Sequence, residues 1–420
     1  MKRFIYLLAA VAATLILNGC LGGAYQLGSS APAPTNVRVV PGDSSVTLTW
    51  DSSPNVEYWV FTAPGTNVTT SNWDTLGGYA YPKAVSPHVV TGLTNDTTYS
   101  FTINARIDGG AGGPGSTPVV AVPRLAGATW TVDPALGSNN LNGAAYGAVF
   151  VAVGNQGALY SSPDFNSYTT TTWTSLTNPM GNPRPNLNAA IYGGVYLAAG
   201  AGGTLLRSGD AVTWTQQTTG TSNDLYGLAT NGAGGYVAVG QNGTILTSSG
   251  GQTWTVQSSG TTNDLYAVAY GYGVWVAVGK SGTVLTSLNA VNWTAIASNT
   301  TQTLKGVVYG VATHPATTTT AATANAVFVA VGAGGTQLTS TDYGATWTAG
   351  TINSGLNNLN AVSYGRQFVA VGNNGSLFTS TDAATWTAQA SGTSSDLNAI
   401  AHSTTNISVV GATGTNLSAI

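Results

Sequence analysis

Residues 359 to 388 read LNAVSYGRQFVAVGNNGSLFTSTDAATWTA and contain four short segments rich in β-branched and aromatic residues. Gly, Asn and Asp, which favour tight turns, separate the segments. Four strands of about six residues with short connections need roughly 40 residues, the length of one β-propeller blade. The stretch therefore predicts a four-stranded blade.

The same pattern recurs from Gly127 to Ile420, where three independent markers each occur seven times. The first marker is a tryptophan, at positions 130, 173, 214, 254, 293, 347 and 386. The second is a leucine that opens each unit, at positions 141, 187, 225, 265, 304, 359 and 397. The third is a pair of glycines three apart, starting at positions 154, 200, 240, 279, 332, 372 and 411. Residues 127–420 are therefore predicted to form a seven-bladed β-propeller.

The two ends of the repeat region predict how the ring closes. The last unit, from Leu397 to Ile420, lacks the strand that follows the tryptophan in the other units. Such a strand, Thr129-Trp130-Thr131-Val132, stands alone before the first unit. We expect this N-terminal strand to complete the seventh blade, which leaves no long unpaired edge.

Residues 36–123 alternate apolar and polar side chains, the pattern of strands with one buried face. Pro34, Trp50 and Gly92-Leu93 followed by Tyr99 give this segment a resemblance to the fibronectin type III domain, including its tyrosine corner. The resemblance implies a two-sheet sandwich that acts as a spacer, with Trp50 and Tyr99 in its core. The predicted fold class is all-β: a fibronectin type III-like sandwich followed by a seven-bladed propeller closed by an N-terminal strand.

The first 19 residues have the parts of a secretory signal, namely a basic start and an apolar run from Phe4 to Leu17. Leu17-Asn18-Gly19-Cys20 resembles a bacterial lipobox, which implies a signal peptide at 1–19 and lipid on Cys20. Cys20 is the only cysteine, so it has no disulfide partner within the chain. Leu21 after the lipidated residue implies delivery to the outer membrane or cell surface of the envelope. The alternative is ordinary secretion with a buried Cys20. Residues 20–35 have many turn formers and no periodicity, so they predict a flexible tether.

Charged residues make up 6% of the chain, against about 25% in an average soluble domain. The formal net charge is −3, so no basic surface can follow a phosphate backbone. This composition excludes a nucleic-acid-binding protein and a salt-bridge-rich helical protein.

One connection between blade strands, Ser340 to Trp347, reads STDYGATW and resembles the Asp-box (BNR) turn of sialidase-type propellers. Two degenerate copies lie at 208–214 and 380–386. In such a turn the aspartate bonds backbone amides and the tryptophan packs between blades. The residues to which we assign this structural role are Asp210, Trp214, Asp342, Trp347, Asp382 and Trp386.

The Asp-box turns raise the hypothesis of a glycoside hydrolase. A sialidase needs three convergent arginines and a glutamate to activate its tyrosine, but the only glutamate is Glu57, in the sandwich. The propeller has three arginines, at positions that do not converge: Arg184, Arg207 and Arg366. The histidines lack metal-ligand spacing: His88, His314 and His402. We therefore expect no catalytic residue, metal or cofactor, and a glycan-active enzyme other than a sialidase, using aspartates, is the alternative.

The repeat is also similar to the propellers of the photosystem II stability and assembly factor family across residues 127–420. The shared patterns are Leu-x-x-Val, Val-x-Val-Gly-x-x-Gly and Asp-x-Gly-x-x-Trp. The resemblance implies a propeller that binds protein partners and is not an enzyme. The arginine-rich patch associated with that family has no counterpart in this sequence. A role in assembling another envelope protein is therefore a further alternative.

Connections between blades and between second and third strands should lie together on one face, the face through which propellers most often bind. There the sequence places neutral amides and few charges: Asn155, Gln156, Arg184, Gln241, Asn242, Lys280, Asn373 and Asn374. Amides both donate and accept hydrogen bonds, which suits sugar hydroxyls or peptide groups better than phosphate. The alternative is that these residues are only turn formers. We expect a non-catalytic monomer, anchored to the membrane by lipid, that binds a protein or polysaccharide and no nucleic acid.

The lipid anchor gives the first testable prediction. Cys20→Ala should move the protein from the membrane fraction to the soluble fraction, because no other residue of the sequence resembles an acylation site. Metabolic labelling with a fatty acid, followed by fractionation, measures both properties. Unlabelled wild-type protein together with unchanged partitioning of the variant would show that Cys20 carries no lipid.

Overall fold

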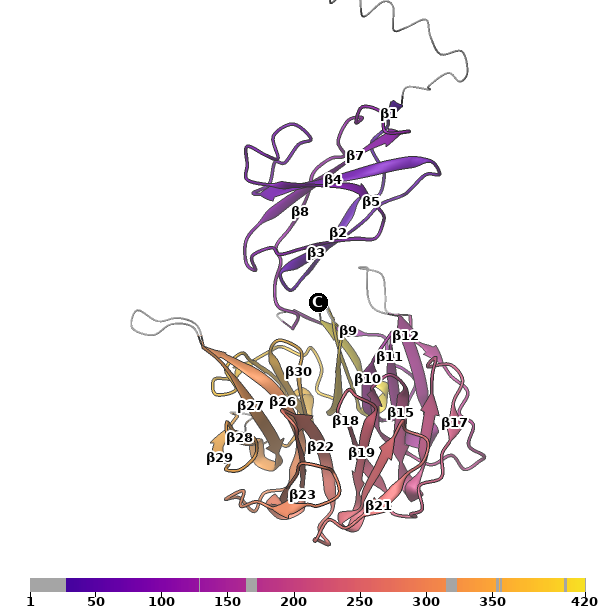
Figure 1. The fold of residues 1–420 in the computed structure, drawn as a ribbon, viewed down its shortest axis with the longest axis vertical. Helices are drawn as coiled ribbons and strands as arrows, with labels where there is room; N and C mark the ends of the chain where they lie inside the picture. The colour runs from indigo at the N-terminus through magenta and orange to yellow at the C-terminus, as the bar shows by residue number, and fades with distance from the viewer. Residues whose placement is uncertain are drawn as a thin grey trace, which may run out of the picture. The chain divides into compact units, whose positions relative to one another are not determined.

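The computed structural model describes residues 28–127, 129–163, 172–314, 323–352, 355, 357–403 and 406–419. The predicted signal peptide and Cys20 lie outside the described residues. The described chain consists of strands joined by loops and short 3-10 turns (Figure 1). None of its helices has the length and apolar character needed to cross a membrane. It divides into two compact units, of which the first holds most of the chain up to Val122 and the second holds the chain from Pro123 together with Val40–Val46 and Thr91–Asp96.

The first unit is a sandwich of two antiparallel sheets. One sheet has the order β1 (Ser29–Ala31), β7 (Tyr99–Ile107), β4 (Val56–Pro64) and β5 (Tyr79–Ala84), with β8 (Val119–Ala121) also paired to β7. The other has the order β2 (Arg38–Gly42), β3 (Ser45–Thr49) and β6 (His88–Thr91). In β7 the apolar residues Phe101, Ile103 and Ala105 alternate with polar ones, as the period of two predicts, but the polar residues between them are buried as well, so both faces of this strand are covered.

Trp50 and Tyr99, on which the sandwich prediction rests, differ in how far they are buried. Trp50 is 5% exposed and its ring centroid lies 5.7 Å from that of Tyr58. Tyr99, at the start of β7, is half-buried rather than fully enclosed. Trp50 is therefore a core residue as predicted, whereas Tyr99 lies at the edge of the core.

The predicted tether, residues 20–35, is wrong over three residues. Ser29–Ala31 forms β1 and pairs antiparallel with β7, from Ser29 opposite Ile107 to Ala31 opposite Ala105. The sequence Ser-Ser-Ala has no apolar alternation, so its side chains give no sign of a strand. Backbone pairing with an available edge decides its conformation.

The second unit is the propeller, in which the described residues form seven four-stranded antiparallel sheets. The first strands are β10 (Leu141–Tyr146), β14 (Leu187–Tyr192), β18 (Leu225–Thr230), β22 (Leu265–Gly271), β26 (Leu304–His314), β30 (Leu359–Tyr364) and β34 (Leu397–His402). The second strands are β11 (Val149–Gly154), β15 (Tyr196–Gly200), β19 (Gly235–Gly240), β23 (Val274–Gly279), β27 (Thr323–Gly332), β31 (Phe368–Gly372) and β35 (Ile407–Gly411). The third strands are β12 (Leu159–Pro163), β16 (Leu205–Ser208), β20 (Ile245–Ser249), β24 (Val284–Ser287), β28 (Thr336–Ser340), β32 (Leu377–Ser380) and β36 (Asn416–Ala419). The fourth strands are β13 (Thr174–Ser175), β17 (Thr215–Gln216), β21 (Thr255–Gln257), β25 (Thr294–Ala295), β29 (Thr348–Thr351), β33 (Thr387–Ala388) and β9 (Trp130–Asp133).

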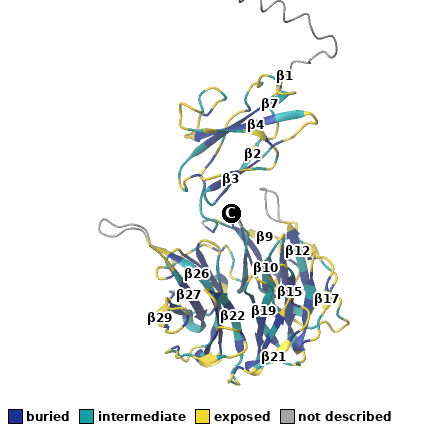
Figure 2. Cartoon of the chain, in the orientation of Figure 1, coloured by how far each residue is buried: buried dark blue, intermediate teal, exposed yellow. Residues whose placement is uncertain are grey.

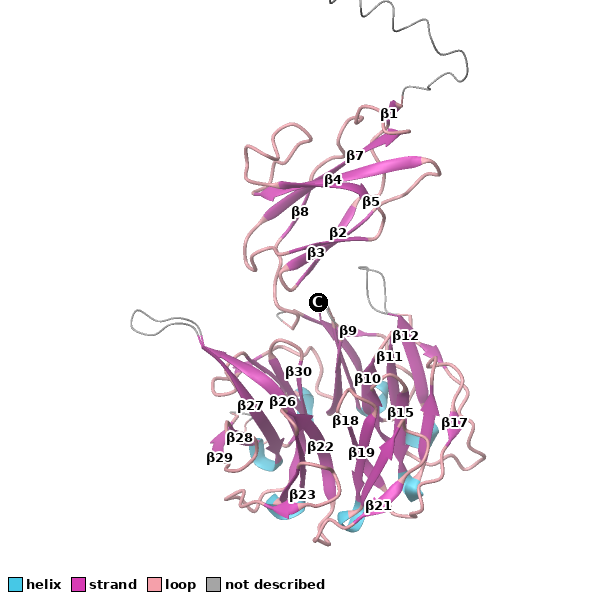
Figure 3. Cartoon of the chain, viewed as in Figure 1, coloured by secondary structure: helices cyan, strands magenta, loops and turns pink. Residues whose placement is uncertain are grey.

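A 3-10 turn joins the second strand of each blade to the third. These turns are η1 (Asn155–Gly157), η2 (Ala201–Gly203), η3 (Gln241–Gly243), η4 (Lys280–Gly282), η5 (Ala333–Gly335), η6 (Asn373–Gly375) and η7 (Ala412–Gly414). Because successive strands are antiparallel, all of these turns lie at one face of the ring, drawn in cyan in Figure 3. The connections between third and fourth strands lie at the opposite face.

The ring closes as the sequence predicts. The seventh sheet has the order β34, β35, β36 and β9, so its last strand comes from the N-terminal end of the propeller. The register runs from Trp130 opposite Ala419 to Asp133 opposite Asn416.

The core of the propeller lies between blades, because each second strand presents alternate side chains to its two neighbours. Val151 and Val153 of the first blade, for example, pack against Tyr196 and Ala198 of the second. Figure 2 shows buried residues along the strands of the blades and exposed residues at their connections. Each fully buried valine or phenylalanine contributes roughly 1.5–3 kcal/mol through removal from water.

The connection between β16 and β17 is organised by Asp210. Its Oδ1 accepts hydrogen bonds from the backbone N–H groups of Val212 (2.9 Å) and Thr213 (2.8 Å), and from the hydroxyl of Ser208 (2.9 Å). These bonds stabilise the charged form, so they lower the pKa of Asp210 to about 2.

The equivalent turns use the same device with different residues. Asp342 accepts from the backbone N–H of Thr346 at 2.9 Å, and Asp382 accepts from two backbone N–H groups in its turn. Asn289 holds the fourth-blade turn with its amide oxygen, bound by two backbone N–H groups. An amide therefore takes the place of the carboxylate in that turn.

The tryptophans that follow these turns lie between blades. Trp214 and Trp347 are 5% and 4% exposed and belong to apolar clusters shared with the preceding blade. Trp386 is partly buried against a similar cluster. The indole N–H of Trp347 donates to the carbonyl of Gly344 at 3.2 Å, which fastens the ring to its own turn.

Closure gives the second prediction. A chain lacking residues 1–133 should have a Tm more than about 5 °C below that of a chain lacking residues 1–123, because it loses β9 and leaves β36 as an edge. Scanning calorimetry of the two truncated proteins measures the difference. Equal melting temperatures would contradict closure by β9.

Asp210 gives the third prediction. Its folded pKa of about 2 lies below the ordinary 3.8, so its contribution to stability is present above about pH 4 and is lost as the pH falls toward 2. Asp210→Asn should therefore lower Tm at pH 6 and differ less from the wild type at pH 2. Asn289→Asp is the reciprocal control and should gain pH dependence over the same range. A difference between Asp210→Asn and wild type that is constant from pH 6 to pH 2 would refute this role.

Candidate binding site at one mouth of the channel

Every blade has the same irregularity at the start of its first strand. The register between first and second strands shifts directly after the opening leucine, as between Leu141 and Gly143. The residue in between is the extra residue of a β-bulge, a device that redirects a side chain. In chain order these residues are Asn142, Asn188, Tyr226, Tyr266, Lys305, Asn360 and Asn398.

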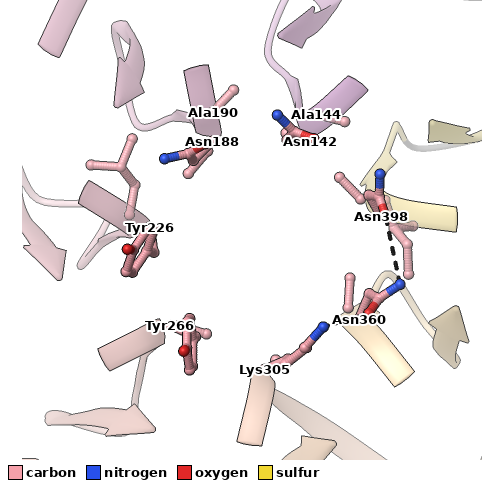
Figure 4. A pocket seen from close by; sticks show the side chains of 18 of the residues that line it. Asn142, Ala144, Asn188, Ala190, Tyr226, Tyr266, Lys305, Asn360 and Asn398 are labelled. Atoms are coloured by element: carbon pink, nitrogen blue, oxygen red, sulfur yellow. Dashed lines mark hydrogen bonds between the residues drawn. The ribbon is translucent and has the colours of Figure 1, made fainter. Parts of the chain in front are cut away.

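These seven residues, called the mouth ring below, line a cavity of about 220 Å³ at the centre of the propeller. Figure 4 shows them around a common opening, with Tyr226 and Tyr266 adjacent on one side. Small residues of the first strands, such as Gly143, Ala189 and Gly227, lie behind the ring. The first strands begin at the face that carries the 3-10 turns, so the ring belongs to that face.

The four asparagines of the mouth ring connect neighbouring blades. Each donates its Nδ2 to the carbonyl of the opening leucine in the next blade: Asn142 to Leu187 (3.0 Å), Asn188 to Leu225 (3.0 Å), Asn360 to Leu397 (3.0 Å) and Asn398 to Leu141 (2.9 Å). Asn360 also donates to Asn398 at 3.5 Å. These asparagines therefore have a structural role, and their side chains are largely engaged.

Three consecutive blades depart from this pattern. Tyr226 and Tyr266 lie side by side with ring centroids 5.4 Å apart and planes inclined by 31°. Burial raises the pKa of both phenols, and the charges of nearby aspartates, Asp264 among them, add to the shift, so both hydroxyls stay protonated at neutral pH. The ammonium group of Lys305 donates to Oδ1 of Asn360 at 3.1 Å.

The 3-10 turns surround the mouth ring and are tied to the next blade. Their middle residues have φ between 53° and 61°, a conformation that favours Gly and Asn: Gln156, Gly202, Asn242, Ser281, Gly334, Asn374 and Thr413. The N–H of Asn242 donates to Asp264 of the next blade at 2.8 Å, and that of Asn374 to Asp396 at 2.9 Å. The N–H of Thr413 donates to Asn140, which carries the pattern across the point of closure.

The structure places the sequence-predicted residues of this face in three positions. Asn155 and Asn373, the first residues of their turns, each accept a hydrogen bond at 2.8 Å from a mouth-ring asparagine. Gln241 and Lys280 are the first residues of the turns in the blades that carry Tyr226 and Tyr266. The exposed residues farther out are Gln156, Asn242, Asn374 and Arg184.

None of the mouth-ring residues is among the candidate binding residues predicted from the sequence. Its members follow the opening leucine of each repeat, so aligning the repeats on that leucine would have shown the variable position. Alternation alone does not mark it, because the bulge interrupts the strand at that point.

Other candidate chemistry is dispersed. Arg184 lies in the connection from β13 to β14, Arg207 in β16, and Arg366 between β30 and β31, at the opposite face from Arg184. Within the described ranges, no group of three or more His, Cys, Asp or Glu could hold a metal ion.

Comparisons with known proteins address the two units separately. Residues 32–122 match the model of the fibronectin type III domain. No curated protein matches the chain.

Solved structures similar to the chain include two propellers. "YCF48 bound to D1 peptide" is 16% identical, with a TM-score of 0.54, over 69% of this chain and 94% of that one. "YCF48 from Cyanidioschyzon merolae" is 17% identical, with a TM-score of 0.52, over 70% of this chain and 98% of that one. At these identities the similarity shows the fold. The chain thus joins a fibronectin type III domain to a seven-bladed β-propeller with the fold of the YCF48 structures.

Proposed function

We propose that the protein is a non-catalytic, lipid-anchored protein of the cell surface whose propeller binds a protein or polysaccharide partner at the channel mouth. The fibronectin type III domain serves as a spacer between the anchor and the propeller. The observation that carries the proposal is the mouth ring: seven bulges direct polar side chains to one opening.

The composition of this face supports binding rather than catalysis. The carboxylates nearest Tyr226 and Tyr266 are those of Asp224 and Asp264, and each accepts a backbone N–H of the preceding blade's turn at 2.8 Å. A general acid–base pair needs carboxyl groups free to exchange protons with a substrate. These two are used to join blades, which weakens the alternative of a glycan-active enzyme working through aspartates.

A protein partner has a precedent in the fold. One of the YCF48 structures contains a bound D1 peptide, so a propeller of this architecture can bind a polypeptide. The sequence identity of 16% transfers no residue from that complex. An assembly role for another envelope protein agrees with the same precedent.

The fourth prediction tests the binding face. A photo-crosslinking residue at position 242 or 374 should capture a discrete partner in cells, whereas the same residue at position 343, on the opposite face and 42% exposed, should not. When the crosslinking residue is at position 242, the changes Lys280→Ala and Asn374→Gly should reduce the amount of partner captured. When it is at position 374, the changes Lys280→Ala and Asn242→Gly should do the same. Glycine suits both positions because φ is 55° in each.

Deleting residues 315–322, which lie between β26 and β27 in the sequence, is the control and should leave the crosslinks from positions 242 and 374 unchanged. If only position 343 gave crosslinks, the binding face would be the opposite one. The same would follow if the deletion abolished the crosslinks from positions 242 and 374.

A further inference from the structure

We propose that Tyr226, Tyr266 and Lys305 form a subsite for one sugar residue of an uncharged glycan. This inference rests on the proposed function, because it names the partner of the same mouth. The supporting observation is that three blades lack the asparagine bond between neighbouring blades that the other four share.

The repeat shows what a purely structural residue at this position looks like. In four consecutive blades around the ring, from Asn360 through Asn398 and Asn142 to Asn188, an asparagine spans to the next blade. Tyrosine and lysine at the other three positions do not form this bond, and a typical hydrogen bond contributes a net stability of roughly 0.5–1.5 kcal/mol. Three adjacent departures from one stabilising pattern indicate a requirement other than stability.

The two tyrosines provide an aromatic wall. Both are half-buried in the mouth, and their rings are in contact, with centroids 5.4 Å apart and planes inclined by 31°. A pyranose ring has an apolar face of C–H groups, which packs against aromatic rings, and a rim of hydroxyls. Tyrosine suits this ligand because its body is apolar while its hydroxyl forms hydrogen bonds.

The hydrogen-bonding groups around this wall match hydroxyls. Both phenols are protonated, and that of Tyr266 donates to the Asp264 side chain, so the hydroxyl of Tyr226 can donate as well as accept while that of Tyr266 can accept. The Lys305 ammonium has three N–H donors, of which Asn360 takes one. A sugar hydroxyl can therefore find both a hydrogen-bond donor and a hydrogen-bond acceptor within the subsite.

The charges around the subsite have both signs. Among the described residues that line the cavity, Lys305 alone is charged, and Asp224 and Asp264 lie close enough to Tyr226 to raise the pKa of its phenol. An anionic ligand would approach these carboxylates and a cationic ligand the ammonium of Lys305, whereas an uncharged polyhydroxyl ligand avoids both costs.

The cavity is small, and apolar residues such as Leu228, Val268 and Ile400 line it together with the polar mouth ring. Its volume of about 220 Å³ is below the roughly 300–1,000 Å³ of pockets for drug-sized ligands, so it admits a single ring. Gly227, Ala267 and Gly306, which follow the three subsite residues in the chain, also line it.

The fifth prediction uses a variant that restores the repeat. Tyr226→Asn, Tyr266→Asn and Lys305→Asn together give every blade the asparagine that four blades already carry, so the variant should keep or exceed the wild-type Tm. Tyr272→Asn with Tyr343→Asn is the matched control. It removes an exposed stacked tyrosine pair, 4.2 Å between centroids, at the opposite face.

The probes are tetrasaccharides of β-1,4-glucan, α-mannan, chitin and polygalacturonate, together with a random peptide library displayed on phage. Binding is measured by calorimetry and saturation-transfer NMR on the protein that contains both the fibronectin type III domain and the propeller. At least one of the three uncharged tetrasaccharides should bind, the polygalacturonate should not, and the triple variant should weaken binding at least about tenfold, which is roughly 1.4 kcal/mol. The matched control should bind as the wild type does.

Three outcomes would overturn the inference. If no uncharged tetrasaccharide binds while peptides are retained by the wild type and lost by the triple variant, the sugar subsite is wrong and the proposed function stands. If the acidic tetrasaccharide binds best, the charge argument is wrong. If sugars bind equally to the triple variant but not to the Tyr272/Tyr343 variant, both the subsite and the proposed binding face are wrong.

Discussion

The pairing of β36 with β9 is the contact on which the propeller depends. It joins Trp130–Asp133 to Asn416–Ala419 across almost the whole length of the propeller sequence. Without it, the seventh blade would end in an unpaired edge, and the interfaces that this blade forms with its neighbours would lose a strand. A closed ring holds its seven bulges in fixed positions around one opening, so closure is also a condition for the candidate site.

The position after the opening leucine stabilises the ring in four blades and contributes to the proposed subsite in the other three. Where asparagine follows the opening leucine, its amide binds the next blade's carbonyl, as Asn188 does with Leu225. Where Tyr226, Tyr266 or Lys305 stands, the side chain faces the cavity without that bond among the interactions of the described residues. Because the other blades, the bridging aspartates and closure by β9 hold the ring, three blades can differ without opening it.

The scarcity of charge has a structural explanation. The connections that salt bridges often stabilise in other proteins are held here by amides, hydroxyls and a few aspartates that accept backbone N–H groups, as Asp210 and Asn289 do. Such bonds are local and directional, so they suit a structure built of short repeated turns. They also leave few charges on the face that carries the 3-10 turns, the proposed binding face.

The architecture of this protein follows from patterns in its sequence. Leucine, glycine and tryptophan markers recur at blade length, and an isolated Trp-Thr strand at one end matches the strand missing from the other, so blade number and closure follow from local patterns. Tertiary structure alone decided two things. Ser29–Ala31 becomes a strand through backbone pairing with β7, which no side-chain pattern encodes. The inward direction of Tyr226, Tyr266 and Lys305 depends on a bulge in each blade and on the seven first strands meeting at a common axis, a property of the assembled ring and of no single repeat.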